Sequence, residues 1–198
     1  MPDIAERYAH SHYNLRRKVL TLIGAKFHIY APDGSLALFA KMKGFKIKED
    51  IRLYADEEMT SEMLAISTKS VFDIAGTYDV RDTTTGETLG ALRRKGLKSM
   101  IRDEWLILDP QGAEVGKIVE DSQLAALVRR FIEMVSFFLP QKYHAEIGGS
   151  PVAEFKQNMN PFVHRIAIDF SMDRGHKLDP RLGLAAAVLL CAIEGRQS

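Results

Sequence analysis

Residues 178–195 read LDPRLGLAAAVLLCAIEG, and the predicted fold follows from this segment. Its central residues, 182–193, carry no charge and no side-chain amide, and most of them are Ala or Leu, which favour a helix. Asp179 suits the helix cap, Pro180 suits the first helical position, and Gly195 suits the end. Because a helix that is apolar on every side has to be buried on every side, we expect the rest of the chain to surround it.

A membrane anchor is the less favoured alternative for this helix. Residues 182–193 are too few to span a bilayer, which needs about 20 apolar residues. The single cysteine, Cys191, lies within the helix, and a lone buried thiol fits a reducing compartment. The N-terminus carries no apolar core of the length that a signal peptide has. We therefore expect a cytoplasmic protein, at most peripheral to a membrane.

The composition favours one globular domain. The chain has 198 residues, of which 46% are hydrophobic, and this suffices for one sizeable core. A net charge of +1 gives no global field that would attract nucleic acid, so no nucleic-acid partner is expected. Residues 1–12 are polar and mixed, which predicts a mobile N-terminal arm or a short helix. We expect residues 13–198 to form the single domain.

The chain between the arm and the final helix has the pattern of antiparallel strands. In residues 36–43, apolar side chains alternate with Lys41 and Lys43, and such runs recur between turn signals such as Pro-Asp-Gly at 32–34. A helical pattern interrupts them between residue 121 or 122 and Pro140. About twelve strands result, and a closed antiparallel barrel would both remove their exposed edges and bury the final helix. The predicted class is mainly β with a central α-helix.

Three motifs, in this order, resemble those of a known superfamily. They are KFHIYAPDG at 26–34, GKI at 116–118 leading into the helical segment, and the polar loop at 172–179 that precedes the Ala/Leu helix. They resemble the tubby-like fold, a twelve-stranded barrel around a hydrophobic C-terminal helix, shared by tubby C-terminal domains, phospholipid scramblases and LURP-one-related proteins. The resemblance covers about residues 13–195 and is strongest to bacterial LURP-one-related proteins.

The resemblance implies a lipid-headgroup site on an early strand. Tubby domains bind phosphoinositide headgroups with a Lys-x-Arg pair, and Lys41 and Lys43 lie at the matching place, thirteen residues before Tyr54 in the case of Lys41. Two residues of one strand with this spacing point the same way, so both could reach one phosphate cluster. The alternative is a solvated outer strand face, where Lys is common.

A second basic stretch lies at residues 91–102, which contain no acidic residue. It could contact an anionic membrane or an acidic partner. The favoured alternative is a solvated hairpin whose charge is balanced by the acidic residues of 50–62. Its basic residues are Arg93, Arg94, Lys95, Lys98 and Arg102.

These observations favour a non-enzymatic binding module for anionic phospholipid headgroups or a protein partner. The sequence contains no Gly-x-Ser-x-Gly, metalloprotease or Cys-x-x-Cys motif, and His10 and His12 have no third ligand at metal-binding spacing, so neither a cofactor nor a metal is expected. The alternatives are a scramblase-like lipid-handling protein and an enzyme with a site at a barrel end. The scramblase reading is weakened because the chain lacks a Pro-rich N-terminal region and a cysteine cluster.

Overall fold

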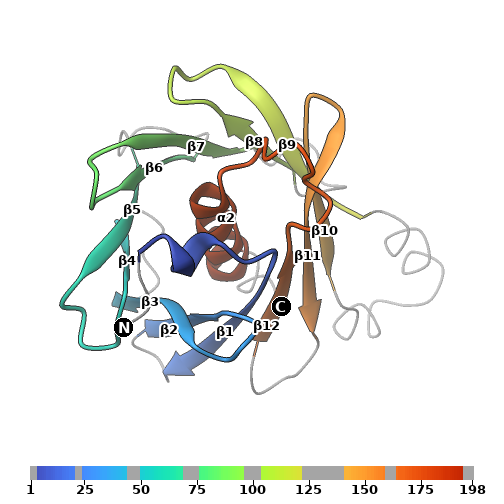
Figure 1. Ribbon diagram of the computed structural model, residues 1–198. Helices are drawn as coiled ribbons and strands as arrows, with labels where there is room; N and C mark the ends of the chain where they lie inside the picture. Colours follow the sequence, from blue (N-terminus) through green and yellow to red (C-terminus); the bar gives the residue numbers. More distant parts are fainter. Residues whose placement is uncertain are drawn as a thin grey trace.

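The computed structural model describes residues 4–20, 24–43, 50–68, 76–95, 104–121, 141–158 and 164–193. Within them, twelve antiparallel strands close into a barrel around one α-helix (Figure 1). The strands are β1 (His12–Leu20), β2 (Gly24–Tyr30), β3 (Leu36–Lys43), β4 (Ile51–Tyr54), β5 (Glu62–Thr68), β6 (Thr77–Asp82), β7 (Thr88–Arg94), β8 (Glu104–Leu108), β9 (Glu114–Glu120), β10 (Lys142–Ile147), β11 (Ser150–Asn158) and β12 (His164–Asp169). The helices are the 3-10 helix η1 (Glu6–Tyr8) and the α-helix α2 (Pro180–Ile193).

The barrel is an up-and-down meander in which every strand pairs with its neighbours in sequence. The first and last strands close it, with Tyr13 of β1 opposite Ile168 of β12. Closure leaves none of the twelve described strands with an unpaired edge. The structure therefore confirms both the mainly β class and the closed barrel of about twelve strands.

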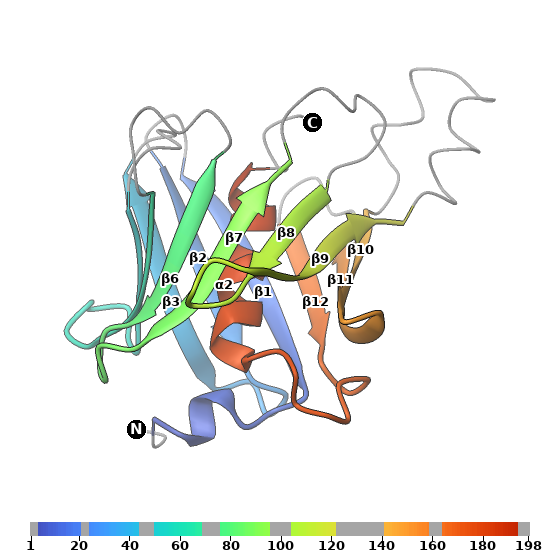
Figure 2. The ribbon, with the colours of Figure 1, turned by 90° about the horizontal axis from the view of Figure 1, so that it is seen from above.

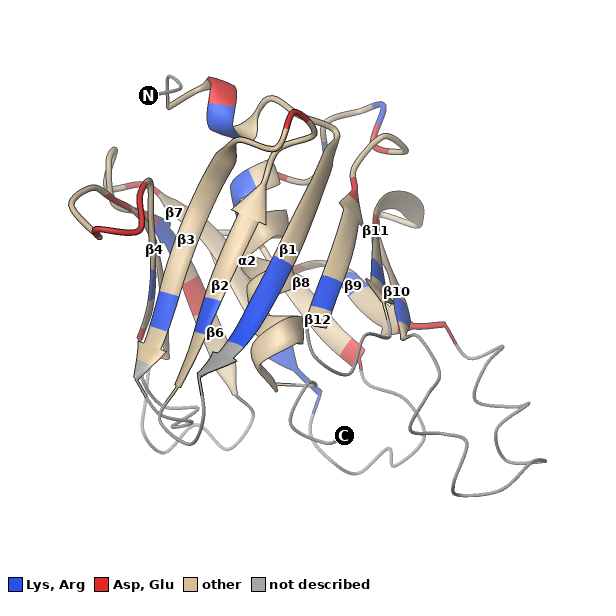
Figure 3. Ribbon diagram, turned by 90° about the horizontal axis from the view of Figure 1, so that it is seen from below, with Lys and Arg blue, Asp and Glu red and all other residues tan. Residues whose placement is uncertain are grey.

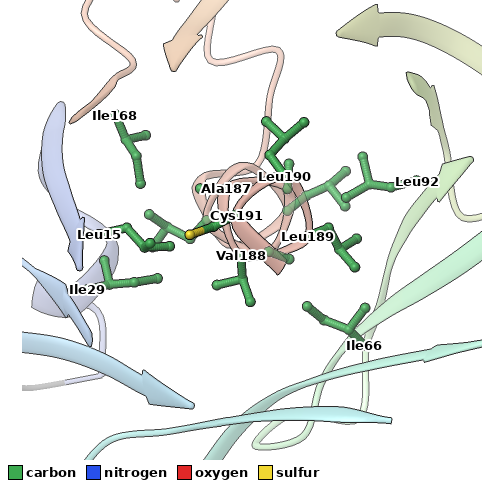
Figure 4. Close-up of a cluster of buried hydrophobic side chains, with 14 of the residues drawn as sticks. Leu15, Ile29, Ile66, Leu92, Ile168, Ala187, Val188, Leu189, Leu190 and Cys191 are labelled. Carbon is green, nitrogen blue, oxygen red and sulfur yellow. The ribbon is translucent and has the colours of Figure 1, made fainter. Parts of the chain in front are cut away.

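Side chains alternate between the inside and the outside of the wall, as the period of a strand requires. On β1, Leu15 packs in the core and Arg16 is exposed; on β2, Ile29 packs in the same core. Figure 4 shows Leu15, Ile29 and Ile168 pointing from the wall towards the helix. Outward positions are thus set by the same alternation that builds the core.

Helix α2 fills the interior of the barrel, as the sequence predicts. All residues from 182 to 193 are buried, and Ala187 is 0% exposed. The backbone N–H of Arg181 donates to Oδ1 of Asp179 over 2.8 Å, which is the predicted cap. Gly183 lets the helix pack closely against Phe170, because a Cβ atom there would lie 2.6 Å from Cε1 of that ring. The predicted helix end at Gly195 lies outside the described residues.

The far end of α2 is held from inside the wall. Arg17 of β1 is 3% exposed, and its Nη1 donates to the carbonyl oxygen of Cys191 over 3.0 Å. A cation at this position is favourable because the last carbonyls of a helix carry partial negative charge. Burial raises the pKa of Cys191 to about 12.

No helix in the described part of the chain has the length and apolar character needed to cross a membrane.

The N-terminal segment lies across the end of the barrel at which α2 begins (Figure 2). Arg7 of η1 is buried, and its Nη1 donates to the carbonyl oxygens of Ala37 over 2.8 Å and of Ala55 over 3.1 Å. The hydroxyl of Tyr13 donates to the carbonyl oxygen of Arg7 over 3.0 Å. The mobility expected for residues 1–12 stays a prediction, and the helical segment expected before Pro140 lies outside the described residues.

Candidate functional site

Five cationic side chains project from the outer wall of four adjacent strands, β12, β1, β2 and β3. We call this surface the basic face; its residues are Arg165, Arg16, Lys18, Lys26 and Lys41. Figure 3 shows these strands side by side, each with a Lys or Arg segment.

Strand register brings these residues together. Arg16 is directly opposite Arg165, and Lys26 is directly opposite both Lys18 and Lys41. Because adjacent strands lie about 4.8 Å apart, the row of three lysines starts from backbone positions that span about 10 Å. The barrel thus assembles from distant parts of the sequence a positive surface with the width of several phosphate groups.

The cations of the basic face differ in their partners from several other cations on the wall. Elsewhere, Nη1 of Arg52 lies 2.7 Å from Oε1 of Glu62, and Nζ of Lys95 lies 2.6 Å from Oε1 of Glu104. Lys117 and Lys142 form similar pairs with glutamates on neighbouring strands. Among the residues that the structure describes, no member of the basic face forms an ion pair. Its charge therefore remains available to an external anion.

Aromatic rings on the outer wall support two of these cations. The guanidinium carbon of Arg16 lies 4.9 Å from the ring centroid of Tyr30, and Nζ of Lys26 lies 5.9 Å from that of Phe39. Such contacts favour a cation over the ring face by about 0.5–1 kcal/mol at exposed sites. They restrict the two side chains to positions close to the strands, which lowers the entropy that binding would cost.

His28 packs beneath this layer and contacts the carboxylate of Glu57. Its ring stacks on Tyr30 with the centroids 5.9 Å apart and contacts Phe39 edge-on at 5.0 Å. Its Nε2 lies 3.2 Å from Oε1 of Glu57, and its Nδ1 is buried without a hydrogen-bond partner. Glu57 is therefore engaged by His28, and does not form an ion pair with the lysines or arginines of the basic face.

The predicted headgroup pair, Lys41 and Lys43, lies at the edge of the basic face. Lys41 is exposed on β3. Lys43 ends the same strand, with its backbone opposite Gly24, but its side chain lies outside the described part of the structure. Headgroup binding by this pair stays a prediction, to which the structure adds the neighbouring cations.

The second predicted stretch does not project as one group. Arg93 faces outwards, and its Nε donates to Oγ1 of Thr77 over 3.1 Å. Arg94 is opposite Trp105, a core residue, and is therefore on the inner side of the wall. Lys95 is paired with Glu104. Lys98 and Arg102 lie outside the described residues.

The acidic residues near the start of α2 form a structural network. Arg181 approaches Asp82, Glu87 and Asp179, with nitrogen–oxygen distances of 2.7, 3.0 and 2.6 Å. Burial by itself raises the pKa of Asp82, but hydrogen bonds from Thr84 and Arg181 outweigh it, so the pKa of this carboxyl lies below its usual value. A carboxylate held ionised and saturated in this way fits a structural role better than proton transfer.

Within the described ranges, no group of three or more His, Cys, Asp or Glu side chains is placed to hold a metal ion. His12, one of the two N-terminal histidines, instead lies 3.3 Å from a carboxylate oxygen of Asp169.

Comparison with known proteins identifies one family. The model of the LURP-one-related family matches residues 36–191, more than three quarters of the chain. The match extends from β3 to α2 and thus includes most of the barrel and its central helix. No curated protein and no solved structure matches the chain significantly. The narrower similarity to bacterial members stays a prediction. On this match, the chain belongs to the LURP-one-related family.

Proposed function

We propose that this protein is a non-enzymatic binding module whose basic face engages anionic phospholipid headgroups. One observation carries the proposal: five cations are brought together on four adjacent strands and have no carboxylate partner among the described residues, whereas Arg52, Lys95, Lys117 and Lys142 elsewhere on the wall are each paired with a glutamate. Unpaired positive charge on one surface favours an anionic ligand, because no internal ion pair has to be broken on binding.

The layout of the charges suits an extended anionic surface. They lie on strands rather than within a cleft, so a large flat ligand can approach several of them at once. Each Lys or Arg close to an anionic leaflet contributes about 1 kcal/mol, so five give reversible, peripheral attachment. Arg16 and Arg165 additionally offer planar guanidinium groups that can bind phosphate through two hydrogen bonds.

Sedimentation with vesicles tests this function directly. Neutral phosphatidylcholine vesicles are compared with vesicles containing phosphatidylserine or a phosphoinositide, each at low and at physiological salt. We expect binding that requires anionic lipid and weakens as salt rises, since screening reduces attraction between exposed charges. The phosphoinositide and phosphatidylserine vesicles are matched in total charge. Tighter binding to the phosphoinositide vesicles would indicate that the row of lysines binds a multiply phosphorylated headgroup.

Absence of binding to every anionic vesicle would contradict the lipid ligand and leave an acidic protein partner for the same surface. The scramblase-like alternative is separated by a second readout on the same vesicles, namely movement of labelled lipid between the leaflets. Binding without such movement supports the binding module.

A further inference from the structure

The wall formed by β5 to β8 lies across the barrel from the basic face (Figure 1). This wall carries a groove. The groove has a volume of about 480 Å³ and is bounded by the turn that follows β8. Its polar lining includes Ser67, Thr77, Asp79, Arg81 and Arg93. This volume falls within the range of roughly 300–1,000 Å³ that is usual for small-molecule sites.

Both arginines of the groove are anchored in a way that leaves their ends available. Nε of Arg93 donates to Oγ1 of Thr77 over 3.1 Å, and Nε of Arg81 donates to the carbonyl oxygen of Gly86 over 3.0 Å. Within the described part of the chain, neither guanidinium forms an ion pair. The terminal nitrogens can therefore bind a carboxylate through two parallel hydrogen bonds, and the bond at Nε fixes the orientation beforehand.

The order of charges along the groove is positive, negative, positive. Thr77 of β6 is opposite Arg93, Asp79 is opposite Ala91, and Arg81 follows further along β6. Because Tyr78 and Val80 face the core, the alternate residues of β6 share the outer surface. Thr77 and Arg81 are four residues apart, which is about 13 Å along an extended strand. Asp79 would repel an anionic group placed at the centre, whereas each end would attract one.

The floor of the groove adds an apolar surface to the charged side chains at its ends. Ala91 and Leu108 are buried and apolar although they lie on the outer side of the wall, where they pack with each other. Such a floor accommodates a short hydrocarbon chain between polar ends. We infer that the groove binds an elongated small organic dianion, with one carboxylate at Arg93, one at Arg81 and a neutral or hydrogen-bond-donating middle.

Calorimetric titration of the full chain with dicarboxylates of increasing length, from succinate to suberate, tests the inference. Hexanoate serves as the reference with one carboxylate. We expect saturable binding that is strongest at one chain length and at least about tenfold weaker for hexanoate, because one charged hydrogen-bonded pair is lost. Arg81→Gln and Arg93→Gln should each reduce the affinity for the tightest-binding dicarboxylate by a similar factor.

Arg165→Gln, which removes an exposed arginine from the basic face, is the matched control and should leave dicarboxylate binding unchanged. Conversely, the Arg81→Gln and Arg93→Gln variants should bind anionic vesicles as the unaltered protein does. Ligand binding by the groove and lipid binding by the basic face are therefore tested independently. Thermal unfolding verifies that each variant is folded. The inference is overturned if no dicarboxylate binds saturably, if hexanoate binds equally well, or if either groove variant retains full affinity.

Discussion

Arg181, near the start of the central helix, donates from Nη1 to Oδ2 of Asp82 over 2.7 Å and thereby connects α2 to β6. The Asp82 side chain is 4% exposed, and it also accepts hydrogen bonds from the backbone and hydroxyl of Thr84. The helix is therefore fixed within the barrel by a partly buried ion pair at its first turn as well as by apolar packing.

Stability should fall in acid because of this pair. The folded-state pKa of Asp82 is below its usual value, so its contribution is fully present above an unfolded pKa of about 3.9 and is lost as pH falls through the folded pKa. Asp82→Asn should lower the unfolding free energy at neutral pH by about 1–3 kcal/mol, since a charged hydrogen bond is lost. Urea unfolding measured from neutral pH into acid should show a shallower pH dependence for this variant.

The control for that series is Glu87→Gln, which removes an exposed partner of the same arginine. Glu87→Gln should lower the unfolding free energy by no more than about 1 kcal/mol, as is usual for exposed ion pairs. Equal pH dependence of Asp82→Asn and the unaltered protein would contradict a stabilising role for the ionised carboxyl.

Cys191 provides a probe of the central helix because it is the single cysteine. It is buried within α2, and its raised pKa of about 12 disfavours the reactive thiolate. A thiol reagent at mildly alkaline pH should modify the folded protein only as fast as the barrel opens, and modification should accelerate sharply through the urea transition. Rapid, stoichiometric modification under native conditions would show that the helix is not enclosed.

Gly183 should resist replacement by Ala even though Ala is the better helix former. An added Cβ would lie 2.6 Å from Cε1 and 2.7 Å from Cζ of Phe170, so the ring or the helix has to move. We expect a loss of about 1–3 kcal/mol of unfolding free energy, which is typical of overpacking. Gly175→Ala is the control, because its nearest atom would be Cγ of Lys177 at 3.5 Å. A Gly183→Ala variant of unchanged or greater stability would contradict this packing.

A charge within the helix should prevent folding altogether. Ala187 is 0% exposed, and an aspartate there would be buried without a partner. Ala187→Asp should therefore be recovered insoluble or unfolded by circular dichroism. Ala113→Asp, at an exposed turn position, should fold normally. Soluble Ala187→Asp protein of normal stability would refute the enclosed helix.

The central helix and the class of the wall could be predicted from sequence because each depends on local periodicity. The apolar run of residues 182–193 requires burial on all sides, and alternating strands are the wall that provides it. The cap at Asp179 and the helix start at Pro180 follow from local chemistry in the same way.

The candidate surfaces were harder to predict because they depend on strand register. Lys41 could be assigned to an outward position from its own strand, but its alignment with Lys26 and Lys18 is a property of the pairing. Arg16 and Arg165 meet only because the first and last strands close the barrel. Alternation, by contrast, was available in the sequence and already separates neighbours such as Arg93 and Arg94 onto opposite sides of the wall.

The measurement that tests the proposed function most directly compares two triple variants of equal charge in vesicle binding. One replaces Lys18, Lys26 and Lys41 of the basic face with Gln; the other replaces the paired lysines Lys95, Lys117 and Lys142. At about 1 kcal/mol per lysine, the first variant should lose about 100-fold in affinity for anionic vesicles, and the second should lose much less. Equal losses in both variants, or full binding by the first, would contradict a basic face that binds lipid headgroups.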